Sequence, residues 1–488
     1  LAEAVQVAAA SHRIKVGGAF RLVDYSQTYA FGSVPIAYYS GLDGFADDRG
    51  AYFGLQNAPA AVSFTVAEPR LFVQDTWSIA PEVDLIVGIT FDAQRFPTDL
   101  ISANTSWITL SGISNATVPR DRKGAGGRGG FVWNVRNAGT TVVRGGAGLY
   151  PDRLDPSVMA EVVTSNGGLG VNRAFGDVGQ WPEVDNTTVT ASRLTLFSDT
   201  YRAPRSFRLD GGLTQAVGTS GSVTFSGLFN HSDFLLRRVD LNRLPRSVAN
   251  TTEDRPVYAT LAKEDALVGP VPGSGRRFAA FDHVFGLAPT GYADYYELTA
   301  RLDQRLSQGL AFDASYTWSR TRDNVVGRLS PDPADRLSPF PEGIDGVDWT
   351  IGTSDLDIPH RVVGRLEYRG SGSTPISLGV RGRWRSGAAF TPGLPLGVDL
   401  NGDGAVGNDP APILASLAGL GAALSSHGCT AGPGPFVARN SCREPSVGAL
   451  DLHLSVGLPV GGRDGRVQLV VDAFNVVATR QGVIDRAL

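Results

Sequence analysis

The chain has no apolar run that approaches the roughly 20 residues needed for a membrane-spanning helix. Its 44 Lys and Arg residues are nearly balanced by 48 Asp and Glu residues, which gives a net charge of −4. That charge excludes a general nucleic-acid-binding protein, which would normally be strongly basic. The only lysines are Lys15, Lys123 and Lys263, so nearly all of the positive charge is carried by arginine.

Motifs for catalysis and cofactor binding are also missing. The sequence has no phosphate-binding loop and no His-Glu-x-x-His motif, and its six histidines are scattered without the spacing of metal ligands. Gly124, Gly126 and Gly129 fit the pattern G-x-G-x-x-G. They precede a predicted strand instead of joining a strand to a helix, which favours a flexible loop end over a nucleotide site. No enzyme activity is therefore predicted.

Strands are what the sequence does contain, and tight turns alternate with long loops between them. The predicted strands cover residues 13–24, 64–79, 83–93, 129–136, 140–150, 203–217, 222–236, 291–305, 308–322, 358–370, 375–388, 447–459 and 466–476. Every second connection is a tight turn, and the others are long. Bacterial outer-membrane barrels have short periplasmic turns and long extracellular loops, whereas a sandwich or propeller has no reason for this asymmetry.

Alternating side chains support a barrel. From Leu310 to Ser319, apolar residues including Phe312, Tyr316 and Trp318 alternate with small or polar residues, so one face is apolar and the other polar. The strands are about 10–15 residues long, which is enough to cross a bilayer at a tilt. No linker divides residues 1–488. We therefore predict one all-β domain, a transmembrane antiparallel β-barrel, in the outer membrane of a Gram-negative bacterium and in contact with its lipid.

Arginines gather on the polar face of one predicted hairpin. They are Arg361, Arg365 and Arg369 on one strand and Arg381, Arg383 and Arg385 on the next. They could line a route for anionic or polar solutes. Alternatively, they could form a structural ladder with carboxylates of the lumen or contact a plug.

Two further features lie in the predicted extracellular loop 389–446. Cys429 and Cys442 are a close pair in an oxidising compartment, which predicts a disulfide. Asp399, Asn401 and Asp403 match the first half of an EF-hand loop, which indicates a possible Ca²⁺ site. Position 12 of that motif is Pro410 and not Glu, so a turn that only orders the loop is the alternative.

Several segments resemble the barrel strands of TonB-dependent outer-membrane receptors, and the Oar-like group most of all. They are Gly139–Tyr150, Leu71–Trp77, Asp357–Arg361, Ser315–Ser319, Ala473–Asn475, Arg237–Asn242 and the Asp399–Gly404 loop. The resemblance implies a barrel of 22 strands whose lumen holds a globular plug. It also implies active import of a solute with energy from the TonB–ExbB–ExbD complex.

The resulting functional hypothesis is a receptor that imports a scarce extracellular solute and binds it through long loops, without a required cofactor. Trp181, Tyr258, Phe278 and Phe281 could contact that solute or could pack the loops together, and Arg381, Arg383 and Arg385 could contact it in the lumen. A surface adhesin and a passive porin are the alternatives. An upstream plug would favour import.

The strand count predicts that the chain is incomplete at both ends. Thirteen strands are an odd number, and single-chain bacterial barrels have an even one. The sequence has no plug, TonB box or regulatory-like domain, so about thirteen strands of a 22-stranded barrel are expected. The expected structure is thus an open, curved sheet with two bare edges.

Overall fold

The computed structural model describes most of the strands and parts of the connections. The described residues are 2–29, 36–39, 46, 50–53, 60–120, 124–135, 139–170, 192–245, 247–248, 256–258, 275–306, 309–325, 350–371, 374–393, 401–403, 409–411, 427–431, 437–459 and 466–478. No helix among them has the length and apolar character needed to cross a bilayer.

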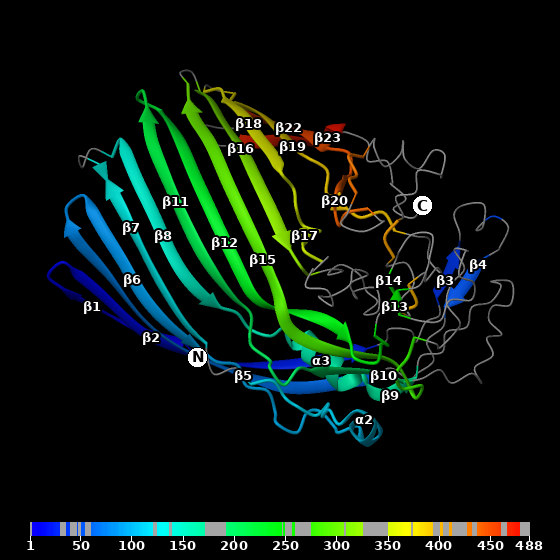
Figure 1. Cartoon of the computed structure of the whole chain (residues 1–488). Coiled ribbons are helices and arrows are strands. Elements are labelled where there is room, and N and C mark those ends of the chain that lie inside the picture. Colours follow the sequence, from blue (N-terminus) through cyan, green and yellow to red (C-terminus); the bar gives the residue numbers. More distant parts are fainter. Residues whose placement is uncertain are drawn as a thin grey trace.

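The main sheet is an antiparallel meander in which each long strand pairs with the next one along the chain. Its strands are β1 (Ala2–Ala9), β2 (His12–Tyr29), β5 (Ala60–Ala80), β6 (Val83–Asp92), β7 (Ala125–Asn134), β8 (Thr141–Pro151), β11 (Arg205–Val217), β12 (Gly221–Asp240), β15 (Phe281–Arg305), β16 (Leu310–Asp323), β18 (His360–Arg369), β19 (Ile376–Arg385), β22 (Val447–Pro459) and β23 (Arg466–Ala478). Figure 1 shows them as one curved wall.

The expected open sheet is confirmed, but the count of thirteen strands is wrong by one. Strand β1 was not predicted. Its eight residues alternate Val5 and Val7 with Glu3 and Gln6, and they pair with β2 across a tight turn. Fourteen long strands are therefore described. Among the described residues, β1 pairs only with β2 and β23 only with β22, so the sheet is not closed.

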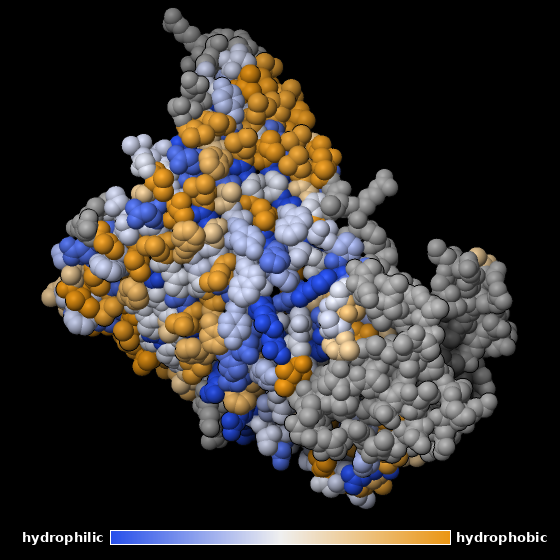
Figure 2. Space-filling model, turned by 45° about the horizontal axis from the view of Figure 1, so that its top comes forward, coloured by the Kyte–Doolittle hydropathy of each residue, from blue (hydrophilic) through white to orange (hydrophobic). Residues whose placement is uncertain are grey.

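The two faces of the wall differ as the alternation predicted. On β16, Ala314, Tyr316 and Trp318 are exposed on the apolar face, and the register places Asp313 on the other face opposite Arg365 of β18. The apolar face is the one that meets lipid, because it carries large exposed hydrophobic side chains from most of the long strands. Figure 2 shows hydrophobic patches around a central strip of hydrophilic side chains.

The height of the apolar band fits one bilayer. Counted from the tight-turn end of each strand, the band ends at the eleventh residue of β2, Leu22, and at the tenth of β5, Leu71. Beyond Leu22 the outward residues of β2 are polar, namely Asp24, Ser26 and Thr28, and Thr65 of β5 donates a hydrogen bond to Asp24 over 2.6 Å. A strand needs about 9–11 residues to cross a tilted span. The remaining residues of these long strands therefore project from the extracellular side.

A folded cap lies on the lumen side at this extracellular end, and its helices were not predicted. It contains α2 (Thr105–Ser111), α3 (Pro156–Thr164), β9 (Asn166–Gly170) and β10 (Ser192–Phe197). Met159 and Val162 of α3 are buried in one core with inward residues of β5, including Val66. Since β10 also pairs in parallel with the outer part of β15, the cap joins distant parts of the wall (Figure 1).

Short strand pairs order the described parts of the other connections. They are β3 (Ile36–Tyr39) with β4 (Gly50–Phe53), β13 (Ser247–Val248) with β14 (Pro256–Val257), and β20 (Ala389–Phe390) with β21 (Cys442–Arg443). A further short strand, β17 (Gly352–Thr353), pairs with the extracellular end of β16, beyond the residues of β16 that pair with β18. The described parts of these connections thus contain secondary structure of their own.

Candidate solute-binding surfaces of the lumen and loops

The six arginines of the β18–β19 hairpin share the lumen face. In the antiparallel register, Arg361 lies opposite Arg385 and Arg365 opposite Arg381. The same rows continue to carboxylates on the flanking strands, since Asp313 of β16 is opposite Arg365 and Asp451 of β22 is opposite Arg381. The register therefore builds a row in which acidic residues flank two basic ones.

Only part of this arginine cluster is neutralised by its neighbours. Glu367 forms ion pairs with both Arg365 and Arg369, and Arg383 donates a hydrogen bond to the Asn475 side chain over 3.1 Å. Arg361, Arg381 and Arg385 make no hydrogen bond or ion pair with a described residue. Because like charges repel, the unpaired guanidinium groups favour an anionic partner here.

A hollow of about 1140 Å³ lies against the tight-turn half of this cluster. Its lining includes Arg301, Arg365, Arg369, Arg381 and Asp451. The arrangement thus combines arginines that are paired with carboxylates of the wall and arginines whose guanidinium groups line a hollow on the lumen face.

The loop aromatics that could have contacted a solute occupy packing positions. Phe281 is 3% exposed and meets Trp107 of α2 edge to face, with ring centroids 5.5 Å apart. Phe278 packs on the same indole. Tyr258 is also 3% exposed and lies under the Arg243 guanidinium, 3.9 Å from its ring centroid. Trp181 lies outside the described residues.

The candidate calcium loop is only partly within the described residues. Asn401 and Asp403 are buried, and the backbone N–H of Asp403 donates to Asn401 Oδ1 over 2.8 Å, which forms an Asx turn. Gly402 between them has φ = 70°, a conformation that favours glycine. Asp399 lies outside the described residues. The described His, Cys, Asp and Glu side chains form no group of three that could hold a metal ion.

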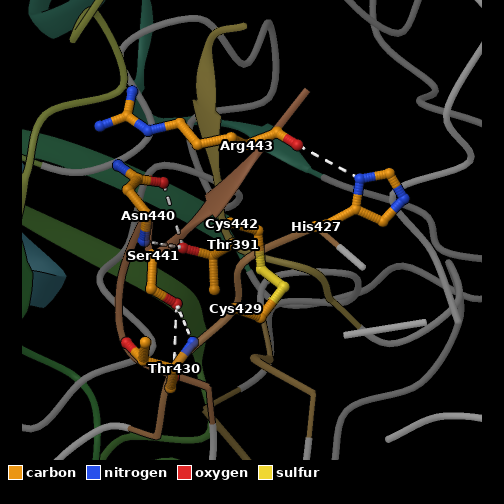
Figure 3. Close-up of a disulfide and its surroundings, with 8 residues drawn as sticks. All are labelled: Thr391, His427, Cys429, Thr430, Asn440, Ser441, Cys442 and Arg443. Carbon is orange, nitrogen blue, oxygen red and sulfur yellow. Dashed lines mark hydrogen bonds between the residues drawn. A yellow bond between two sulfur atoms is a disulfide. The ribbon is translucent and has the colours of Figure 1, made fainter. Parts of the chain in front are cut away.

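Cys429 and Cys442 form a disulfide whose Cα atoms are 4.2 Å apart. Figure 3 shows the polar contacts around it. Thr391 Oγ1 accepts a hydrogen bond from the backbone N–H of Asn440 over 2.7 Å, and Ser441 Oγ accepts one from Thr430 over 3.0 Å. The disulfide therefore lies among three segments of one connection that hydrogen bonds hold together: β20 with Thr391, residues 427–431, and β21 with Asn440 and Ser441.

Arg237–Asn242, a segment known from its sequence only by the family resemblance, organises the cap. Arg238 forms a two-point ion pair with Glu161 of α3, with both N–O distances 2.5 Å. Asp240 binds Arg276 over 2.7 Å and His283 over 2.9 Å, and the Asn242 side chain donates to three backbone carbonyls of residues 278–282. The available signal was four polar residues within six positions, Arg237, Arg238, Asp240 and Asn242, at the end of an alternating strand.

The charge of Asp240 is fixed by this network. Burial alone would raise its pKa, but the interactions with His283 and Arg276 and the backbone N–H of Asn242 outweigh burial and lower the pKa below its usual value. The carboxylate is therefore ionised at neutral pH, as its hydrogen-bond donors require.

Comparison with known proteins agrees with the fold described above. The outer membrane beta barrel domain family matches residues 1–481. The chain belongs to this family. That membership confirms the predicted antiparallel barrel wall and places the chain in the Gram-negative outer membrane.

A curated relative and two solved structures are similar to this barrel domain. TonB-dependent transporter Oar of Myxococcus xanthus is 24% identical over 410 residues, which cover 77% of this chain and 36% of Oar. The outer membrane transporter YddB from Escherichia coli is 9% identical with a TM-score of 0.50, over 97% of this chain and 48% of YddB. The FrpB iron transporter from Neisseria meningitidis is 11% identical with a TM-score of 0.45, over 93% and 46%.

The match to Oar confirms the resemblance seen in the strand motifs. This chain spans about a third of the length of Oar and about half of YddB. These relatives are named as transporters and not as enzymes, in agreement with the missing catalytic motifs.

Proposed function

We propose that this domain is the barrel wall of a receptor that imports a scarce solute by TonB-dependent active transport. The similarity to Oar along most of the chain carries this proposal. Energy would come from the TonB–ExbB–ExbD complex through a plug in the lumen, as the family resemblance implies. The long connections on one side of the membrane would bind the solute first, and the protein would act as a transporter and not as an enzyme.

The lumen arginines are the best candidates for solute contact within the wall. Arg381, Arg383 and Arg385 lie in one row of β19, and Arg381 borders the 1140 Å³ hollow. Guanidinium groups bind carboxylate and phosphate oxygens through two parallel hydrogen bonds. This supports an anionic solute over a neutral or cationic one.

A comparison of culture media tests the proposal without knowledge of the solute. Three strains of the source bacterium are needed: the parent, one that lacks this gene, and one that lacks TonB. Mass spectrometry of spent medium should show one solute that only the parent depletes. A passive porin would still deplete it without TonB, and an adhesin would leave depletion unchanged in both mutants. Either outcome would contradict active import.

A Ca²⁺ ion held by Asp399, Asn401 and Asp403 is a secondary proposal. One observation supports it: Asn401 and Asp403, at positions 3 and 5 of the spaced motif, carry oxygen donors in a buried turn. The ion would order the loop whose Asn401 backbone carbonyl accepts a hydrogen bond from the Tyr258 backbone N–H over 2.7 Å.

A further inference from the structure

The outward face of the wall changes character at the extracellular end of β12, β15 and β16. Phe229 is the ninth residue of β12, Trp318 the ninth of β16, and Tyr296 the tenth from the tight-turn end of β15. These aromatics end the apolar band at the height where one tilted span is complete. The rings of Phe229 and Tyr296 lie 5.0 Å apart. Aromatic belts of this kind sit at the level of the lipid headgroups.

The next outward residues are charged, and the register makes them neighbours. Arg320 lies opposite Tyr296, while Arg322 lies opposite Asp294, which lies opposite His231. We call these four outward residues the rim row: His231, Asp294, Arg320 and Arg322. The row therefore stands directly beyond the aromatic belt.

The nearby carboxylates are bound to residues other than Arg320 and Arg322. The two ring nitrogens of His231 lie 2.7 Å from Asp294 and 2.9 Å from Asp233, and Asp233 also pairs with Arg205 over 3.5 Å. Both Arg320 and Arg322 are exposed, and neither makes a hydrogen bond or ion pair with a described residue. Two guanidinium groups are thus left without an anion at the level of the headgroups.

The spacing of these two groups suits a phosphate-bearing lipid. Arg320 and Arg322 point to the same side of one strand, so their Cα atoms are about 7 Å apart. The guanidinium fork matches phosphate geometry and is weakly hydrated, which favours binding in the interface. Trp318, one step below on the same face, offers an apolar surface to an acyl chain.

We propose that Arg320 and Arg322 bind the phosphate groups of a lipid in the outer leaflet of the membrane. The guanidinium groups hold the phosphates, and Tyr296 and Trp318 contact the lipid beneath them. This site faces away from the lumen, so it is independent of solute import. It fixes the barrel wall to its surrounding lipid on the side of β15 and β16.

The test measures retention of lipid A by the protein in neutral detergent micelles, using native mass spectrometry. Variant Arg320→Gln/Arg322→Gln should weaken binding roughly thirtyfold. The matched control is Arg144→Gln/Arg208→Gln, which removes the same charge from exposed positions on the lumen face and should bind like the parent. Variant Arg320→Lys/Arg322→Lys should recover part of the affinity, and circular dichroism should show the same strand content throughout.

The source of the phosphate is decided by two more probes. Dephosphorylated lipid A, with the same acyl chains, should bind as weakly as lipid A binds the Gln variant. Inorganic phosphate at equal concentration should not displace lipid A. Equal retention of the two lipids, displacement by inorganic phosphate, or the same loss in the lumen control would overturn the proposal.

Discussion

Arg439 and Asp323 form an ion pair that is almost completely shielded from solvent. Nη2 of Arg439 lies 2.6 Å from Oδ1 of Asp323, and the two side chains are 2% and 6% exposed. Nη1 of the same guanidinium donates to the backbone carbonyls of Asp323 and Thr350 over 2.8 and 2.6 Å. One arginine therefore joins the connection that follows β16 to the connection that carries the disulfide.

Removal of this arginine should release both connections. In Arg439→Met, Asp323 stays buried without its partner, and a broken buried pair costs about 3–5 kcal/mol. We expect faster proteolysis at residues 350–357 and 437–443, while the strands of the wall stay resistant. Limited proteolysis with mass spectrometry measures both regions in one experiment.

A double variant separates the loss of contact from the unpaired charge. Asp323→Leu/Arg439→Met removes both charged groups, so its protection should recover toward that of the parent. If the double variant is as labile as Arg439→Met, the buried charge is not the cause. The backbone hydrogen bonds of Arg439 would then be the dominant contribution.

Cys429 and Cys442 should be bonded to each other in the folded protein. Quantitative thiol labelling of the unreduced, unfolded chain should modify neither Cys429 nor Cys442, and labelling after reduction should modify both. Closing a loop of this size stabilises by about 3 kcal/mol in the chain-entropy account. Cys429→Ser/Cys442→Ser should therefore loosen residues 437–443, with Cys442 buried beside Val437 as the reason. Labelling of the unreduced chain would contradict the pair.

The wall was predictable from sequence because its strand alternation and its tight turns depend on residues that are close together in the sequence. Alternation such as Leu310–Ser319 follows from one face in lipid and one in the lumen, and every tight turn joins strands that are neighbours in the sequence. Strand β1 was missed because small residues such as Ala4 and Ala8 weaken its alternation. The extent of β15 was missed because Val284, Phe285 and Leu287 are buried under the cap and no longer alternate.

The candidate site was less predictable, since it depends on contacts between distant segments. The shared face of Arg365 and Arg381 follows from period 2, but which arginines Glu367 neutralises does not. The packing of Phe281 on Trp107 joins residues 174 positions apart, which no local pattern encodes. Arg439 and Asp323 are likewise separated by 116 positions.

Asp240 should make the cap sensitive to acid. Its folded pKa is lowered, so its contribution to stability is present at neutral pH and is lost as the pH falls through that folded pKa. Asp240→Asn should therefore speed hydrogen exchange in residues 276–284 at pH 7. The difference from the parent should shrink as the pH falls below the usual carboxyl range. A difference that stays constant with pH would show that the charge of Asp240 is unimportant.

Ca²⁺ binding at the loop around Asn401 should depend on the Asp403 carboxylate. Calorimetry of the protein in detergent should show Ca²⁺ binding that is lost in Asp403→Ala, because a carboxylate is removed from the oxygen donors. Asp409→Ala is a control that removes another buried carboxylate outside the spaced motif. No Ca²⁺ heat, or equal heat in the parent and Asp403→Ala, would leave the Asx turn as the full explanation of this segment.

The unpaired lumen arginines should matter more for transport than the paired ones. Arg381→Gln removes a guanidinium with no described partner, whereas Arg369→Gln removes one that Glu367 already binds over 2.5 Å. For the solute identified by medium depletion, we expect uptake to fall about tenfold or more in Arg381→Gln, because a charge-assisted contact is worth about 1.5–3 kcal/mol. Arg369→Gln should stay near the parent rate, and Arg381→Lys should lie between. Equal uptake in Arg381→Gln and Arg369→Gln would contradict this prediction. The lumen arginines of β18 and β19 would then have a structural role in the wall and no role in binding the solute.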